Sequence, residues 1–197
     1  MPAGAFRDLT AARASVRRYD LARPVSEAAL AAILEAARMA PSAENAQPWR
    51  FIVVRDPALR ARLVAEAFSG VYQRSRRIAA PVYLALCGVR GAVDLGGRLL
   101  GHASYTLTDC GIAGEHAVLA AAELGLGTCW IGWFDRRRAR RVLGVPAGVE
   151  LVALIALGWP AEPHPATQRT KGRKPLSAIV WLDGWGKPFP GGQSERV

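Results

Sequence analysis

Between a helix-forming pattern and a strand-forming pattern, this chain carries the segment Ala40-Pro41-Ser42-Ala43-Glu44-Asn45-Ala46-Gln47-Pro48-Trp49-Arg50-Phe51. The segment is more polar than a simple turn between two such elements requires. Asn45 and Gln47 each offer an acceptor and two donors, so together they can bind an edge on which donors and acceptors alternate. Pro41 and Pro48 restrict the backbone and hold these amides in place before any ligand arrives. The segment therefore predicts a preformed ligand-binding loop, and we assign Trp49 a packing role at its end.

The flanking residues predict helices alternating with strands. Ser26 and Glu27 suit the start of a helix, apolar residues then recur at helical spacing, and Pro41 prevents continuation, which gives a helix over 27–39. Patterns of the same kinds predict helices over 58–68, 106–124 and 136–143, and strands over 51–54, 82–89, 129–131 and 150–157. Residues 91–101 fit no single element, and 176–181 fit either a helix or a strand. This order indicates an α/β or α+β domain with a central sheet.

Two basic clusters accompany the loop. One is Arg13-x-Ser15-x-Arg17 and the other is Lys171-Gly172-Arg173-Lys174. Arginine supplies several fixed donors for a phosphate group and lysine adds a point charge. Arg13 and Arg17 become neighbours if their segment is helical. Each cluster alone is more often part of a solvated surface than a phosphate site, so the phosphate interpretation depends on their occurrence beside the amide loop.

Length and charge limit the class of protein. The 197 residues suit one domain, residues 1–197, or a subunit that completes its core by dimerising. The net charge of +10 raises the possibility of a nucleic-acid partner. The arginines are spread along the whole chain without an aromatic-interleaved stripe or a nucleic-acid motif, which argues against that partner. The chain shows no N-terminal signal pattern and no apolar run long enough to span a bilayer, so we expect a cytoplasmic protein without a membrane partner.

Several familiar catalytic patterns are absent from the sequence. No G-x-G-x-x-G follows a predicted strand, and neither a P-loop nor a G-x-S-x-G elbow occurs. The three histidines lack the spacing of metal ligands, so no metal site is expected, and we interpret His116 as a hydrogen-bonded interior or interface residue. Cys87, Cys110 and Cys129 lie in apolar runs and are interpreted as buried, inert thiols.

Four motifs occur in an order that resembles the nitroreductase family of flavin enzymes. They are Arg-x-Ser-x-Arg at 13–17, Pro-Ser-x-x-Asn-x-Gln-Pro-Trp at 41–49, Gly-Leu-Gly-Thr-Cys-Trp-Ile-Gly at 125–132 and Lys-x-Arg at 171–173. The similarity covers nearly the whole chain, from about Arg13 to Leu176. It implies an α+β fold in which helices flank a central mixed β-sheet, and a homodimer that holds FMN at cofactor sites in the subunit interface.

The resemblance also assigns roles to individual residues. Contacts to the flavin phosphate, ribityl chain or pyrimidine edge are implied for Arg13, Ala14, Ser15 and Arg17. Phosphate binding is implied for Lys171 and Arg173, with Lys174 as a substitute. Pro41, Ser42 and Asn45 would reach the flavin of the partner subunit, and Gln47 would support their loop. One face of the flavin would be lined by Trp130, Ile131, Gly132 and Trp133. The resemblance implies a main-chain contact for Ala14, since the family often carries a larger polar or basic residue there.

The implied chemistry belongs to the cofactor. Hydride would pass from NADH or NADPH to flavin N5 and then to a nitroaromatic, quinone or similar small acceptor by a ping-pong mechanism, with Arg17 stabilising negative charge near N1 and O2. No catalytic side chain is implied. The alternatives are a specialised flavin enzyme of the same fold, such as a reductive dehalogenase or a substrate dehydrogenase, and a non-catalytic flavin-binding or DNA-binding protein. Residues 68–77 and 90–105 are the stretches left for a substrate lid, with Tyr72, Gln73, Arg74 and Arg76 as candidate contacts.

Overall fold

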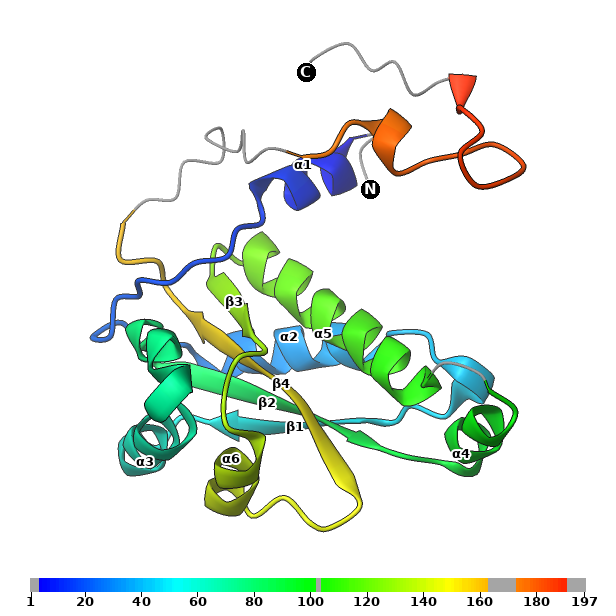
Figure 1. Cartoon of the computed structure of the whole chain (residues 1–197). Helices are drawn as coiled ribbons and strands as arrows, with labels where there is room; N and C mark the ends of the chain where they lie inside the picture. Colours follow the sequence, from blue (N-terminus) through cyan, green and yellow to red (C-terminus); the bar gives the residue numbers. More distant parts are fainter. Residues whose placement is uncertain (1–3, 102–103, 163–172, 191–197) are drawn as a thin grey trace. The chain divides into compact units, whose positions relative to one another are not determined.

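The structure is a computed structural model that describes residues 4–101, 104–162 and 173–190. It divides the chain into two units, Met1–Ala166 and Thr167–Val197. The first unit contains the sheet and the α-helices (Figure 1). The second contains the short 3-10 helix η3 (Leu176–Ala178) and a stack of Trp181 on Trp185, with ring centroids 4.1 Å apart. Since each unit is described by itself, the expected single domain over 1–197 stays a prediction.

A four-stranded sheet forms the centre of the first unit. Its strands are β1 (Trp49–Val54), β2 (Val82–Val89), β3 (Gly127–Ile131) and β4 (Val149–Gly158), in the spatial order β1-β2-β4-β3. Neighbouring strands all pair antiparallel, and the register between β2 and β4 shifts at Leu86 and Cys87. The expected mixed sheet is therefore wrong in detail, because all its strand pairs are antiparallel; among the described residues the only parallel pairing is an isolated bridge outside the strands, between Ser15 and Thr128.

Helices cover both faces of this sheet (Figure 1). The α-helices of this unit are α1 (Ala5–Ala12), α2 (Glu27–Arg38), α3 (Pro57–Ala67), α4 (Ala92–Leu99), α5 (Tyr105–Glu123) and α6 (Arg136–Leu143), and its 3-10 helices are η1 (Ala43–Asn45) and η2 (Gly70–Arg77). Successive side chains of a strand point to opposite faces, and β2 shows the consequence. Leu84 packs with α2 and α5, whereas Tyr83 and Ala85 pack with α3 and α6. Because both faces are covered, β2 is almost entirely apolar and buried.

The long helix α5 is held at both ends. Ser104 caps it by accepting from the Leu107 N–H at 3.4 Å, and Gly125 ends it in the left-handed conformation with φ 77°. His116 is half-buried and contacts the Ala36 carbonyl of α2 through Nδ1 at 3.2 Å, which confirms that it is hydrogen-bonded, as expected of an interior or interface residue. Trp49 is buried with residues of α5, as its packing role requires. The helix therefore joins α2, β1 and the loop before β1.

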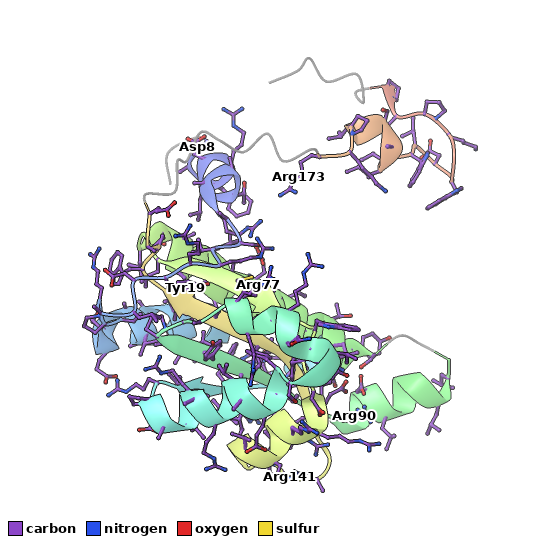
Figure 2. All side chains as sticks on the ribbon, turned by 60° about the vertical axis from the view of Figure 1, so that its left-hand side comes forward. Asp8, Tyr19, Arg77, Arg90, Arg141 and Arg173 are labelled. Atoms are coloured by element: carbon purple, nitrogen blue, oxygen red, sulfur yellow. The ribbon has the colours of Figure 1, made fainter. Side chains whose placement is uncertain are left out.

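The segment of Arg13, Ser15 and Arg17 is extended, so its helical option is wrong. Val16 donates its N–H to the Thr128 carbonyl at 2.8 Å, beside the bridge from Ser15. The physical reason is that side chains alternate between the two sides of an extended segment. Ala14 and Val16 are buried in the core, whereas Arg13, Ser15 and Arg17 are not. Tyr19, labelled in Figure 2, is buried at the end of the segment and donates from its hydroxyl to the Val16 carbonyl.

The pattern analysis did not predict the helices α1, η1 and η2, and residues 91–101, which fitted no element, contain α4. None of the helices in the described ranges is long and apolar enough to cross a membrane. The other predicted helices and strands lie within about two residues of their observed bounds, as is usual for element ends.

Candidate functional site

A pocket of about 510 Å³ opens where η2, the end of β3 and the extended N-terminal segment meet. We call it the arginine pocket, and it is lined by Arg17, Arg74, Ser75, Arg77, Ile78, Cys129, Trp130, Ile131, Gly132 and Trp133. Three of these residues are arginines and none is acidic. No described acidic residue forms an ion pair with any of the three. The pocket is therefore electropositive and suits an anionic ligand.

An aromatic surface forms one side of this pocket. The indole of Trp133 is 60% exposed, donates from Nε1 to the Val71 carbonyl at 3.0 Å and lies against Tyr72 with ring centroids 5.3 Å apart. Ser75 donates from its buried hydroxyl to the Trp133 carbonyl at 2.7 Å and so joins η2 to the segment after β3. At Gly132, an added Cβ would meet nothing within 4 Å. A flat ring can therefore approach both the indole and the main chain here.

Trp130 lines the same pocket, but its indole packs against α5. A Cβ at Gly114 would lie 2.2 Å from Trp130 Cη2, so only glycine leaves room for the ring at this point of the helix. The indole Nε1 donates to Glu115 at 3.3 Å. Glu115 also forms an ion pair with Arg13, with Nε and Oε1 3.7 Å apart. The helix thereby connects β3 to the N-terminal basic segment.

The two arginines of that segment line different hollows. Arg17 faces the arginine pocket and donates from Nη1 to the Ser15 carbonyl at 3.3 Å. Arg13 lines a smaller hollow of about 160 Å³, which also includes residues 125–128 at the start of β3. The side chain of Ala14 is buried, so its expected ligand contact, which stays a prediction, would involve only the main chain. The segment therefore reaches two adjacent regions along the edge of β3.

The loop of residues 41–48 (the 41–48 loop) has an unusual backbone. Glu44, Asn45 and Gln47 have φ values of 50°, 52° and 46°, a left-handed conformation that non-glycine residues seldom adopt. Bonds within the loop hold this shape: Ser42 Oγ accepts from the Gln47 N–H at 2.9 Å, and Gln47 Nε2 donates to Asn45 Oδ1 at 3.1 Å. Strained backbones of this kind cost roughly 1–3 kcal/mol each and concentrate at functional sites. The amides are preformed, as the sequence predicted.

No residue of this loop lines the arginine pocket of the same chain. The loop residues instead border a hollow of about 100 Å³ together with Asp94, Tyr105 and Asp109. Pro41 and Asn45 are exposed, and Ser42 is half-buried. The assignment of this loop to a partner's cofactor agrees with this placement and stays a prediction.

The remaining candidates divide between the two units and the undescribed residues. Lys171 lies outside the described residues, as do His102 and His164. Arg173 and Lys174 belong to the second unit and are exposed. Over the described ranges, no group of three or more His, Cys, Asp or Glu side chains could hold a metal ion. The three cysteines are buried, as expected.

Two acidic residues of α5 were not identified from the sequence. Asp109 accepts from the Ala43 N–H of the 41–48 loop through both carboxylate oxygens, each 3.3 Å away. Burial raises the pKa of the Asp109 carboxyl, the Ala43 N–H opposes that shift, and the nearby Asp94 adds to it. Glu115 is the second acid, bonded to Arg13 and Trp130. The only sequence signal for these two residues was the presence of a carboxylate inside an apolar helix rich in alanine and glycine.

Comparisons with known proteins agree with this geometry. The Nitroreductase family model matches residues 10–159. A Thermus thermophilus protein named NADH dehydrogenase is 35% identical over 191 residues, which cover 85% of this chain and 91% of that protein. A 5,6-dimethylbenzimidazole synthase from Rhodospirillum rubrum is 34% identical over 160 residues, covering 72% and 76%. A solved nitroreductase family protein from Clostridium difficile 630 matches with TM-score 0.73 at 27% identity, covering 90% and 97%. The α+β fold implied by the four motifs is confirmed.

Proposed function

Because the chain belongs to the nitroreductase family, and is thus an oxidoreductase, we propose that it passes hydride from NADH or NADPH through FMN to a nitroaromatic, quinone or similar acceptor. The proposal includes a ping-pong order, in which oxidised pyridine nucleotide leaves before the acceptor binds. It also includes a homodimer with shared cofactor sites and a cytoplasmic location.

The arginine pocket is the observation that carries this proposal. FMN combines a flat ring system with a phosphate dianion, and the pocket combines an exposed indole with three guanidinium groups. Guanidinium groups bind phosphate and polar ring edges through paired donors, and an indole offers a flat apolar surface. Since no acidic residue lines the pocket, its positive charge is available to the ligand. The residues present therefore suit FMN.

When bound, FMN supplies the redox chemistry by accepting and donating hydride at N5. Arg17 would place a permanent positive charge beside the pyrimidine edge, where it favours the reduced form without any proton transfer. Gly132 would leave its main chain open to the ring, since no side chain covers it. Trp133 and Ile78 would exclude water from one side. The protein would thus bind, orient and tune the cofactor.

Residues outside the pocket would complete the site. Pro41, Ser42 and Asn45 are proposed to reach the cofactor of the partner subunit, supported by the preformed shape of their loop and by its absence from the lining of the arginine pocket of its own subunit. Lys171 and Arg173 are proposed to bind phosphate, on the strength of the Lys-x-Arg motif. Ser15 and the main chain of Ala14 are proposed as further contacts.

The test begins with the purified protein and its flavin. We expect a yellow protein whose FMN absorbance is bleached within seconds by anaerobic NADH or NADPH and restored by a nitroaromatic or a quinone. Arg17→Ala should weaken FMN binding at least tenfold, because a charge-assisted contact is lost. Arg62→Ala removes an exposed arginine of α3 that does not line the arginine pocket, and it should bind FMN like the wild type. A wild-type protein that binds no FMN would refute the proposal.

The Rhodospirillum rubrum relative favours a second candidate, a specialised flavin enzyme of the same fold. Such an enzyme would bind FMN but turn over poorly with general acceptors. Mass spectrometry of aerobic incubations with reduced FMN would reveal 5,6-dimethylbenzimidazole if this chain shared that relative's activity. A bleached flavin that no acceptor reoxidises, together with this product, would replace the leading proposal.

A further inference from the structure

We propose that Asp109 is a positioning residue of the cofactor site and that it acts on the partner subunit. Its carboxylate holds the 41–48 loop in the conformation that presents Ser42 and Asn45 to the flavin across the interface. This inference rests on the proposed function, since it assigns a task within the same shared site.

The contact lies where the loop enters its strained conformation. The Ala43 N–H, which donates to both Asp109 oxygens, belongs to the residue immediately before Glu44 and Asn45, the first two left-handed residues. Ser42, on the other side of Ala43, closes the loop through its bond from Gln47. The bond to the Ala43 amide therefore restrains the backbone between the candidate ligands Ser42 and Asn45.

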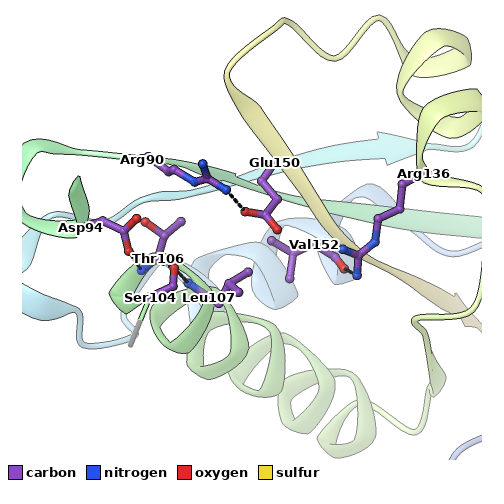
Figure 3. Close-up of polar contacts among 8 residues, drawn as sticks. All are labelled: Arg90, Asp94, Ser104, Thr106, Leu107, Arg136, Glu150 and Val152. Carbon is purple, nitrogen blue, oxygen red and sulfur yellow. Dashed lines mark hydrogen bonds and ion pairs between the residues drawn. The ribbon is translucent and has the colours of Figure 1, made fainter. Parts of the chain in front are cut away.

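The position of Asp109 is itself determined by the start of α5. Asp94 accepts from the Ser104 hydroxyl at 2.9 Å and from the Thr106 N–H at 3.0 Å, and Ser104 caps the Leu107 N–H. Figure 3 shows this group of residues at the first turn of the helix. Asp109 follows one turn later and is only 5% exposed. Its carboxylate therefore projects from a fixed helix rather than from a mobile surface.

A purely structural role would not require a charge at this place. Burying a carboxylate is costly, and a second buried carboxylate nearby adds repulsion. Apolar or amide side chains can fill such a site at lower cost. What the carboxylate adds is a charge-assisted contact to a backbone amide, shared between its two oxygens at 3.3 Å. We infer that this bond offsets the strain of the loop and keeps it ready for the cofactor.

The first experiment separates positioning from stability. Asp109→Ala removes the acceptor and should weaken FMN binding about tenfold, whereas Asp109→Asn keeps an amide oxygen and should stay within about threefold of the wild type. Asp109→Asn should unfold at or above the wild-type temperature, because a buried charge is removed while an acceptor for the Ala43 N–H remains. Asp56→Ala is the matched control. It breaks a carboxylate bond to the Leu59 N–H at the start of α3, and it should lower the unfolding temperature without changing FMN affinity.

The second experiment tests action across the interface. Differently tagged Arg17→Ala and Asp109→Ala chains are combined into a heterodimer and titrated with FMN. If Asp109 serves the partner, both defects fall on one site and the other site keeps wild-type affinity. If Asp109 serves its own subunit, each site carries one defect and no tight site appears, which overturns the inference. Unchanged FMN affinity of the Asp109→Ala homodimer also overturns it, whereas an Arg17→Ala homodimer with wild-type affinity would refute the proposed cofactor site instead.

Discussion

Replacing Gly114 by alanine should destabilise the chain although alanine favours helices. An alanine Cβ would lie 2.2 Å from Trp130 Cη2 and 2.7 Å from Cζ2, so the indole has to move. Overpacking of this kind costs about 1–3 kcal/mol, and losing the indole bond to Glu115 costs about 1 kcal/mol more. The gain in helix propensity returns about 1 kcal/mol. The net loss is about 2 kcal/mol, or roughly 4–8 °C in unfolding temperature for a chain of this size.

Urea unfolding of the flavin-free protein, followed by circular dichroism, measures this loss. Gly111→Ala is the matched control on the same helix, because an added Cβ there meets nothing within 4 Å and the chain should gain up to about 1 kcal/mol. Adding Trp130→Phe to Gly114→Ala should recover part of the loss, since phenylalanine lacks the clashing part of the indole. Equal stability of Gly111→Ala and Gly114→Ala would refute the reasoning.

Three further predictions concern the pocket and the buried polar groups. Burial raises the pKa of the Cys110 thiol to about 12, so a thiol reagent at pH 8 should label this residue only after urea is added; labelling of the folded protein would contradict this. The raised pKa of Asp109 means that this carboxyl is protonated at a higher pH in the folded chain than in the unfolded chain. The free energy of unfolding therefore falls as pH rises and the buried carboxyl ionises. Asp109→Asn should therefore raise the unfolding temperature more at pH 8 than at pH 4, and an equal change at both would disprove the sign. FMN should quench the fluorescence of Trp133, which lines the pocket, and Trp133→Phe should reduce the quenching seen in a titration; undiminished quenching would place the flavin elsewhere.

Local sequence patterns predicted most elements of the fold because each element carries its own periodicity and end signals. Ser26 and Pro41 bracket α2, and the apolar run of β2 follows from burial on both faces. The missed helix α4 contains Gly96 and Gly97, which lower helix propensity and hide the pattern.

The candidate site was predictable only where its parts are contiguous in sequence. The 41–48 loop could be predicted from its prolines and amides. The spacing of Arg13 and Arg17 fits a helix and a strand equally well, and the burial of Val16 in the structure distinguishes the two. Asp109 bonds to a residue 66 positions away, and no local pattern encodes such a contact. The same holds for Glu115 of α5, whose partners come from strand β3 and from the N-terminal segment.

The arginine pocket has a practical consequence for the flavin-free protein. Without an anion, Arg17, Arg74 and Arg77 repel one another across a shared cavity, and any small oxyanion that settles there relieves this repulsion. Inorganic phosphate or sulfate should accordingly raise the melting temperature of the colourless protein through mass action while competing with the cofactor. Affinities measured in phosphate buffer will then understate the strength of flavin binding. A zwitterionic buffer at modest ionic strength contains no competing oxyanion, so the affinity of the arginine pocket for FMN should be measured there.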